Sequence, residues 1–297
     1  MNAPDGTHVV REPEGPERRA CRMLLPESEA TFGWTRRLVA VERGSGTVLG
    51  AAMAMPLRHH DGEVHARFIM RVARPFRGRG IGSAMLSGLS ARARAAGEQA
   101  LVGIAGDRGA VTFLERAGFT LQQRVICWEV DASACGGRIA TLADRARRTG
   151  RVPAGMRVEA LTAAAIPRLA ALHAELIGGA AHALAIRMHE MLADPAWAHS
   201  RMLSVDGVPH AFFAMRTMGA ATGVPFLFVS PHLQAARGSV GGTTLRLFAS
   251  MLEAIQGSPV ERCEFDCLER NGPMMALAAR FGARRTAARE MLIRPVA

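Results

Sequence analysis

Hydrophobic and polar positions alternate along the first half of the chain with two different periods. Two-residue alternation or a short apolar run predicts strands at 37–42, 47–57, 64–72, 100–105 and 120–130. Spacing of three to four residues predicts helices at 81–96 and 109–117. Because these helices alternate with strands, we expect an α/β (α+β) domain, with a mixed, mostly antiparallel sheet flanked by helices.

The second half repeats this order with an additional pair of helices in front. Helices are predicted at 161–177, 182–193, 239–256 and 273–280, and strands at 201–205, 210–218, 225–229, 262–268 and 289–295. Such a repeat indicates two similar domains in tandem. We expect a partly irregular N-terminal extension (1–35), a first domain (36–132), a basic linker helix (133–155) and a second domain (156–297).

Composition agrees with two cytoplasmic domains. The 297 residues are 49% hydrophobic, enough to form a core, and no apolar run reaches the length of a membrane helix. Five scattered cysteines and the lack of a visible signal sequence favour a reducing compartment. The chain contains no Lys and no Tyr. A lysine Schiff base and a phenolic acid are therefore excluded from its chemistry.

The net charge of +11 is concentrated in part in the predicted linker. Residues 136–157 contain one acidic residue, Asp144, and six arginines: Arg138, Arg145, Arg147, Arg148, Arg151 and Arg157. A basic patch can bind nucleic acid, but no aromatic residues are interleaved with these arginines. A solvated helix is therefore the favoured interpretation.

A glycine-rich loop joins the strand at 64–72 to the helix at 81–96. It reads Arg77-Gly78-Arg79-Gly80-Ile81-Gly82-Ser83. Alternating glycines let the backbone approach a ligand, and the helix start directs N–H groups and the positive end of its dipole to the same point. The arginines add charge-assisted hydrogen bonds. The spacing predicts a pyrophosphate site and differs from both the P-loop and the dinucleotide fingerprint.

This loop resembles the coenzyme A loop of the GCN5-related N-acetyltransferases (the GNAT family), whose pattern is Gln/Arg-x-x-Gly-x-Gly/Ala. The resemblance implies that backbone amides at 78–83 hold the pyrophosphate of acetyl-CoA. It also implies that backbone groups of Met70 and Val72 hold the pantetheine arm. The amide of Val72 would polarise the thioester carbonyl.

A second family motif lies in register after the loop. Where the family often has Asn, Ala, Tyr and Gly-Phe, this chain has Asp107, Ala110, Leu114 and Gly118-Phe119. The resemblance covers roughly residues 36–131 and adds Asp107 to the coenzyme-binding set. The second half is similar to the family more weakly. The same offsets recur at Asn271, Met274, Ala278, Gly282 and Ala283, whereas the glycines of 235–242 are out of register. We interpret the second domain as a degenerate, GNAT-like copy that has lost acyl transfer.

The catalytic groups are inferred from single residues, whereas the loop is inferred from a spaced motif. Leu114 and Ala278 replace the tyrosine that acts as general acid in the family, although a thiolate, with a reference pKa of ~8.5, can leave without one. Glu63 and His65 point to the same side of the strand before the loop, which makes them candidates for the general base.

Other groupings near these residues favour simpler interpretations. The turn before the strand holds His59, His60 and Asp61, and together with His65 these could suggest a metal, but the ligand spacing does not support one. Cys263 and Cys267 share one face of a strand and are expected to be a buried pair. We therefore expect no metal.

These observations predict an acetyl-CoA-dependent N-acetyltransferase. The acceptor would be the primary amine of a small molecule or a peptide N-terminus, as in secondary-metabolite or resistance enzymes, and attack would be direct because no Cys lies in either motif. Two alternatives are a catalytically weak, acyl-CoA-binding regulatory protein and a mycothiol-synthase-like acetyltransferase. We expect a cytoplasmic monomer or homodimer without a nucleic-acid or membrane partner.

Overall fold

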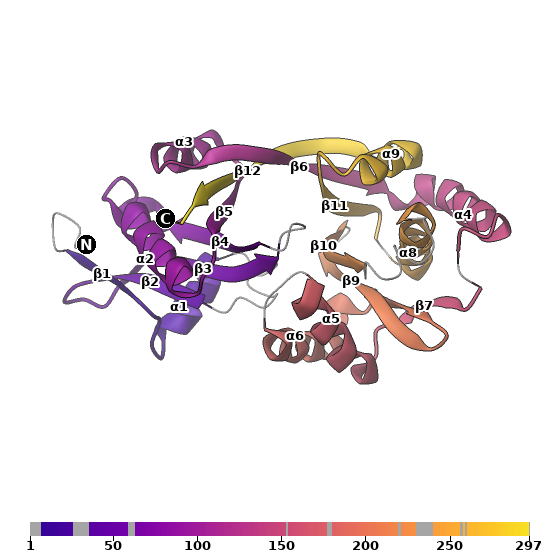
Figure 1. Ribbon diagram of the computed structural model, residues 1–297, viewed down its shortest axis with the longest axis horizontal. Helices are drawn as coiled ribbons and strands as arrows, with labels where there is room; N and C mark the ends of the chain where they lie inside the picture. Colours follow the sequence, from indigo (N-terminus) through magenta and orange to yellow (C-terminus); the bar gives the residue numbers. More distant parts are fainter. Residues whose placement is uncertain are drawn as a thin grey trace. The chain divides into compact units, whose positions relative to one another are not determined.

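The computed structural model describes residues 7–25, 36–58, 63–152, 154–176, 180–218, 221–229, 240–255, 258 and 260–296. The chain forms two units (Figure 1). The first comprises residues 1–122, 177–184 and 290–297, and the second comprises residues 123–176 and 185–289. Neither unit is a single continuous stretch of the chain.

The strands of the first unit follow the order β1-β2-β3-β4-β5-β12 within a 12-stranded sheet. Its elements are β1 (His8–Arg11), α1 (Glu17–Leu24), β2 (Arg36–Glu42), β3 (Val48–Arg58), β4 (Val64–Val72), η1 (Arg74–Phe76), α2 (Ile81–Ala95), β5 (Ala100–Ala105), α3 (Arg108–Arg116) and the end of β12 (Arg284–Pro295). Neighbouring strands are antiparallel except β4 and β5, which are parallel.

The second unit repeats this plan with the strand order β6-β11-β10-β9-β8-β7. Its strands are β6 (Thr120–Asp131), β7 (Met156–Ala160), β8 (Arg201–Val205), β9 (Val208–Met218), β10 (Ala221–Val229) and β11 (Arg262–Leu268). The helices are α4 (Ala132–Arg148), η2 (Ala163–Ala165), α5 (Ile166–Leu176), α6 (Ala181–Ala193), η3 (Pro195–Trp197), α8 (Val240–Ile255) and α9 (Gly272–Phe281). The parallel pair is β10 with β11.

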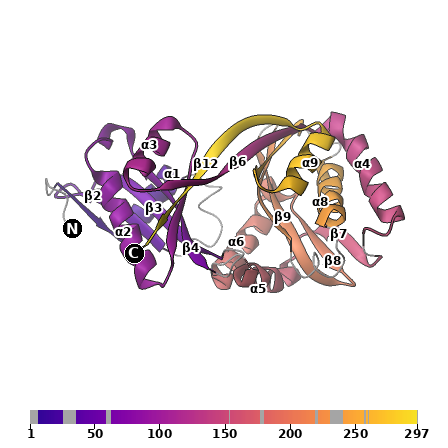
Figure 2. The same ribbon diagram turned by 45° about the horizontal axis from the view of Figure 1, so that its top comes forward.

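The two units exchange one strand each. β6 follows α3 in the chain, yet its residues 125–131 pair with β11 of the second unit. β12 follows α9 in the chain, yet its residues 290–295 pair with β5 of the first unit. Each exchanged strand lies antiparallel to the second strand of a parallel pair (Figure 2). The exchange is therefore reciprocal: each unit receives its last strand from the other half of the chain.

The two faces of the first sheet pack against different helices. One face packs against α2 and α3 in a cluster that includes Leu38, Phe68, Ile81, Met85, Leu89, Leu101 and Leu114. The other packs against α1 in a smaller cluster of Cys21, Leu25, Val39, Val41, Ala51, Met53 and Met55. On β4 the even-numbered Ala66 and Phe68 belong to the first cluster, and Ile69 packs against the second. This alternation assigns every β4 side chain to a face.

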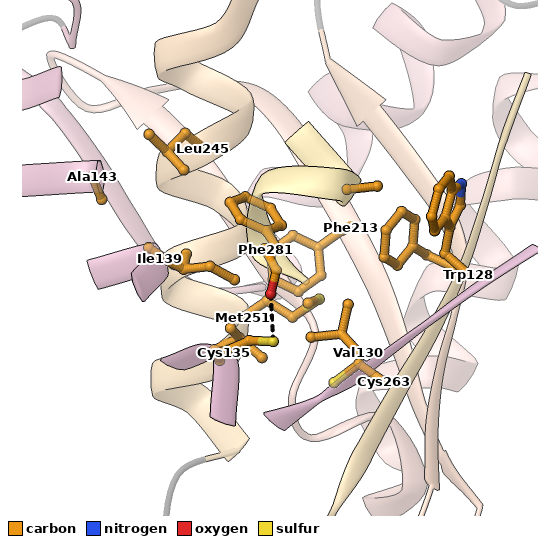
Figure 3. Packing of buried hydrophobic residues seen from close by; sticks show 14 of the residues in the cluster. Trp128, Val130, Cys135, Ile139, Ala143, Phe213, Leu245, Met251, Cys263 and Phe281 are labelled. Atoms are coloured by element: carbon orange, nitrogen blue, oxygen red, sulfur yellow. Dashed lines mark hydrogen bonds between the residues drawn. The ribbon is translucent and has the colours of Figure 1, made fainter. Parts of the chain in front are cut away.

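The core of the second unit lies between its sheet and α4, α8 and α9 (Figure 3). Trp128, Phe213 and Cys263 from the strands meet Ile139 of α4 and Phe281 of α9. The helix layer is joined by a hydrogen bond in which Cys135 Sγ donates to the Phe281 carbonyl at 2.7 Å. The thiol of α4 is thus bonded to the backbone near the end of α9.

The expected fold class, a mixed and mostly antiparallel β-structure flanked by helices, is confirmed, although the strands of both halves belong to one 12-stranded sheet instead of two separate sheets. Within the segment expected to be partly irregular, β1 and α1 are regular elements. Within the segment expected to be a basic linker helix (133–155), α4 spans Ala132–Arg148, and Asp131 caps its start because Oδ1 accepts hydrogen bonds from the amides of Ser133 and Ala134. The expected burial of Cys263 and Cys267 on one face of β11 is also confirmed.

Candidate functional site

β4 and β5 are paired over part of their length and then separate. Their parallel register runs from His65↔Ala100 to Phe68↔Gly103. β4 continues to Val72 and β5 continues to Ala105. Beyond Phe68, therefore, β4 has a partner in β3 but none in β5, and the sheet is open between its two parallel strands.

The backbone of β4 is directed into this opening at Met70 and Val72. The amide of Ala73 donates to the Leu49 carbonyl at 2.9 Å, which makes the Gly50↔Val72 pair a non-hydrogen-bonded one. The N–H and C=O groups of Val72 thus point away from β3, and by alternation those of Met70 do the same. An extended ligand can pair with these groups as an added strand.

The loop after β4 ends in an open helix start. Gly80 precedes α2 with φ 75°, a left-handed conformation, and no side chain caps the helix. The first helical hydrogen bond runs from Ala84 N to Gly80 O at 3.0 Å. The amides of residues 81–83 therefore have no acceptor within the helix, which is the arrangement that binds anions. Ile81 is buried in the core and anchors the turn, whereas Ser83 is exposed.

Gly82 lies close to an aromatic side chain of α3. A Cβ at this position would lie 3.2 Å from Cζ of Phe113 and 3.8 Å from Cγ2 of Val72. With glycine at this position, α2 can start close to Val72 at the end of β4 and to Phe113 of α3. The helix N-terminus and the opening between the strands are brought together by this close packing.

Two arginines of the loop are held beside the helix start. Arg77 Nε donates to the Val72 carbonyl at 3.2 Å, at the edge of the opening. The guanidinium of Arg79 lies over the ring of Phe76, 5.6 Å from its centroid. Both arginines and Gly78 are exposed. Their charges are available to an anion at the loop.

The second motif has structural roles in α3. Asp107 is exposed and caps the helix, with Oδ1 accepting from the Ala110 amide at 2.8 Å. Leu114 is buried in the core shared with α2, at 5% exposure. The position of the family's tyrosine is therefore filled by a packing residue.

The two base candidates lie together at the start of β4. His65 Nε2 is 3.1 Å from Glu63 Oε2, with a buried imidazole and a carboxylate that is half exposed. His65 lies five residues before Met70, which corresponds to about 17 Å along a strand. A proton would need a relay to cover that distance. His59, His60 and Asp61 lie outside the described residues.

The cysteines are unsuited to nucleophilic catalysis. All five are free thiols, and burial raises the pKa of each. Burial raises the pKa of Cys127 to about 11 and that of Cys263 to about 12. These thiols stay protonated at neutral pH, and a protonated thiol is a poor nucleophile.

The second unit repeats part of the site. Its parallel pair also stops early, since the β10–β11 register ends at Val224↔Phe265 while β10 continues to Val229. Asn271 caps α9 by accepting from the Met274 amide at 3.2 Å, at the same offset as the Asp107 cap. Of the glycines of 235–242, Gly238 lies in the loop at 230–239, outside the described residues, and Gly241 and Gly242 lie in the first turn of α8.

Two features are absent from the described part of the chain. It has no helix that is both long and apolar enough to cross a membrane. Within the same residues, no group of three or more His, Cys, Asp or Glu side chains is placed to hold a metal ion.

A family comparison matches the part of the chain that carries this site. Residues 7–119 match the model of the acetyltransferase (GNAT) family. The match begins with β1, well before residue 36, and so includes α1. It confirms the resemblance inferred from the loop. A search of curated proteins gave no match.

Solved structures with a similar fold extend over nearly the whole chain. A tandem GNAT protein from the clavulanic acid biosynthesis pathway is 20% identical, with 96% of this chain and 89% of that one covered and a TM-score of 0.52. A GCN5-related N-acetyltransferase from Sphaerobacter thermophilus is 12% identical, with coverages of 97% and 96% and a TM-score of 0.52. A probable N-acyltransferase from Enterococcus faecalis is 11% identical, with coverages of 98% and 73% and a TM-score of 0.61. These likenesses extend the fold assignment to the second unit.

Proposed function

Because residues 7–119 match the model of the acetyltransferase (GNAT) family, we propose that this chain transfers an acetyl group from acetyl-CoA to a primary amine. The amine would belong to a small molecule or to a peptide N-terminus. One observation carries the proposal: the opening between β4 and β5 leads directly to the uncapped start of α2. A pantetheine arm and its pyrophosphate need these two features side by side.

The pyrophosphate is assigned to the loop from Arg77 to Ser83. Amides of residues 81–83 would donate to its oxygens, with Gly78 and Gly80 allowing the loop to curve around them. Arg77 and Arg79 would add charge-assisted hydrogen bonds. Asp107, as the cap of α3, would act mainly by holding that helix next to the opening.

The reacting carbonyl is assigned to the opening itself. The backbone groups of Met70 and Val72 point into it, so they can pair with the pantetheine amides and donate an N–H to the thioester oxygen. The amine nitrogen attacks the carbonyl carbon, the C–S bond breaks, and the electron pair leaves with sulfur. The amine loses one proton, and the thiolate accepts one from water. Attack is direct, since the buried thiols are protonated.

Glu63 and His65 are proposed as the remote end of a proton relay. The carboxylate can accept from Nε2–H of His65, so the pair can hold a proton and pass it on. The distance along β4 places ordered water between this pair and the attacking amine. Loss of either side chain should therefore slow the reaction without abolishing it.

A coenzyme A-binding regulatory protein is the second candidate. It is favoured by one observation: both positions where the family has a tyrosine are filled by buried apolar residues, Leu114 and Ala278. Such a protein would bind acetyl-CoA and release no coenzyme A thiol in the presence of amines.

The five free cysteine thiols support a reducing compartment, the cytoplasm, for either function.

One experiment separates the two functions. The protein is incubated with acetyl-CoA and a panel of primary amines, thiol release is followed with a chromogenic thiol reagent, and products are identified by mass spectrometry. Amine-dependent thiol release with an acetylated product supports transfer. Tight acetyl-CoA binding by calorimetry without thiol release for any amine supports the regulatory function. Failure to bind acetyl-CoA contradicts both.

A further inference from the structure

The opening between β4 and β5 ends at an aromatic ring. The last bridged pair of the two strands is Phe68↔Gly103. The side chain of Phe68 is buried in the core that packs against α2 and α3. A Cβ on Gly103 would lie 2.8 Å from Cζ of this ring and 3.3 Å from Cδ1 of Leu114. The ring of Phe68 and the side chain of Leu114 therefore occupy the space over Gly103, and we call these three residues the floor of the opening.

Phe68 is held in place by its neighbours. Its ring meets the ring of Phe119 edge to face, with centroids 5.8 Å apart and an interplanar angle of 62°. Phe119 is also buried, and the guanidinium of Arg294 lies 4.9 Å from its ring centroid. Arg294 in turn donates to the Ala117 carbonyl at 2.9 Å. Because a close-packed core resists displacement, the ring of Phe68 cannot recede without disturbing these contacts.

The coenzyme would enter the opening at the end opposite to this floor. Its phosphates are assigned to the start of α2, on the side of the sheet that α2 and α3 cover. The loop follows Val72, so the pantetheine arm passes Val72 and then Met70 on its way towards Phe68. The acyl group is attached at the far end of the arm. It therefore points to the floor, which lies two residues, or about 7 Å, beyond Met70.

We infer that Phe68 limits the length of the acyl group that this chain takes from coenzyme A, and that its donors are short-chain acyl thioesters. The inference rests on the proposed acetyl transfer and deepens it by naming the residue that selects the donor. An acyl chain that ends above the floor fits the opening. A longer chain meets the ring of Phe68, and a methylene that the site cannot accommodate costs about tenfold or more in binding.

A channel without a floor would give the opposite trend. The strand side chains next to the opening on this side of the sheet are Met70, Val72 and Ala105, all apolar. If such a lining continued past Phe68, each additional methylene of the acyl chain would be buried and would strengthen binding by about fourfold. The sign of the dependence on chain length thus distinguishes a closed site from an open one.

Calorimetric titration with acetyl-, butyryl-, hexanoyl- and octanoyl-CoA measures this dependence without an acceptor amine. The ligands share the coenzyme A part, so the ratio of two affinities reports on the acyl group alone. Octanoyl-CoA should bind about tenfold or more weakly than acetyl-CoA. A smaller decrease, or any increase, would overturn the inference.

Variants assign the limit to Phe68. Phe68→Leu and Phe68→Val shorten the side chain over Gly103, so both should relax the discrimination against octanoyl-CoA; if one fails to fold, the other decides. The matched control is Phe119→Leu, which removes a buried ring from the same core without shortening the floor. It should lose stability in thermal unfolding and keep the wild-type ratio of affinities. An unchanged ratio in a folded Phe68 variant, or an equal change in Phe119→Leu, would contradict the assignment.

Thiol release separates failure of the inference from failure of the proposed function. The same thioesters are assayed with the panel of primary amines. Length-selective binding that Phe68→Leu relaxes, without thiol release for any amine, would refute acyl transfer and keep the length limit. Thiol release from acetyl-CoA and octanoyl-CoA with equal kcat/KM would keep acyl transfer and refute the length limit. Absence of both length-selective binding and thiol release would refute both.

Discussion

Replacing Gly80 with valine tests the start of α2 as the phosphate site. Gly80 has φ +75°, and a Cβ there would meet no atom within 4 Å. The cost to stability comes from the left-handed backbone alone and amounts to roughly 1–2 kcal/mol for an L-residue. Gly46 has φ +71° and equally open surroundings in the turn between β2 and β3. Gly46→Val is therefore a control with the same strain in a different place.

The two variants should differ in ligand binding. Valine at position 80 favours a negative φ, which turns the amides of 81–83 away from a common point. A hydrogen bond to a charged group contributes about 1.5–3 kcal/mol, so the loss of even one should weaken binding by about tenfold or more. Calorimetric titration with acetyl-CoA measures the affinity, and thermal unfolding measures the stability of both variants.

The comparison gives a clear negative result if the assignment is wrong. Wild-type affinity in a folded Gly80→Val variant would exclude the loop as the pyrophosphate site. An equal loss of affinity in Gly46→Val would attribute the effect to general destabilisation of the first unit. The expected result is similar destabilisation of both variants with weakened binding in Gly80→Val alone.

Four further predictions concern the same molecule. Calorimetry should find one tight acetyl-CoA site per chain; two tight sites would show that the loop of the second unit also binds pyrophosphate. Leu114→Tyr should lower the melting temperature, because Leu114 is buried in the core, without lowering the rate per folded molecule. The wild-type rate should rise with pH as the attacking amine loses its proton; a falling limb below about pH 9 would indicate a hidden acid. Glu63→Gln and His65→Ala should each lower kcat/KM several-fold, and full activity in both would leave water as the base. Deletion of residues 290–297 should unfold the first unit, because Leu292 is fully buried and Arg294 donates to the Ala117 carbonyl at 2.9 Å; an unchanged melting curve would contradict this.

Local pattern was sufficient to predict most elements and the loop. The helix at α2 follows from the spacing of Ile81, Met85 and Leu89, and its start follows from the glycines before it. These signals are local, since helix periodicity and turn chemistry are contained within a few residues. β1 and α1 were missed because their segment is rich in Pro, Glu and Arg and shows little periodicity.

The pairing between strands that are distant in the chain could not be predicted from the sequence. The alternation in β6 and β12 shows that each has a buried face but not which sheet contains it. The point at which β4 and β5 separate is likewise set by tertiary register rather than by either strand alone.

The reciprocal exchange of β6 and β12 also determines when the protein can finish folding during synthesis. The strand that completes the first sheet, residues 290–295, comes after every element of the second unit in the chain. At about 5–20 residues per second, the ribosome needs on the order of ten seconds or more to reach it after β5 has emerged. During that interval the edge of β5 is uncovered and can pair with other chains. Nascent chains should thus depend on protection of that edge, and premature termination should yield two incomplete sheets instead of one functional half.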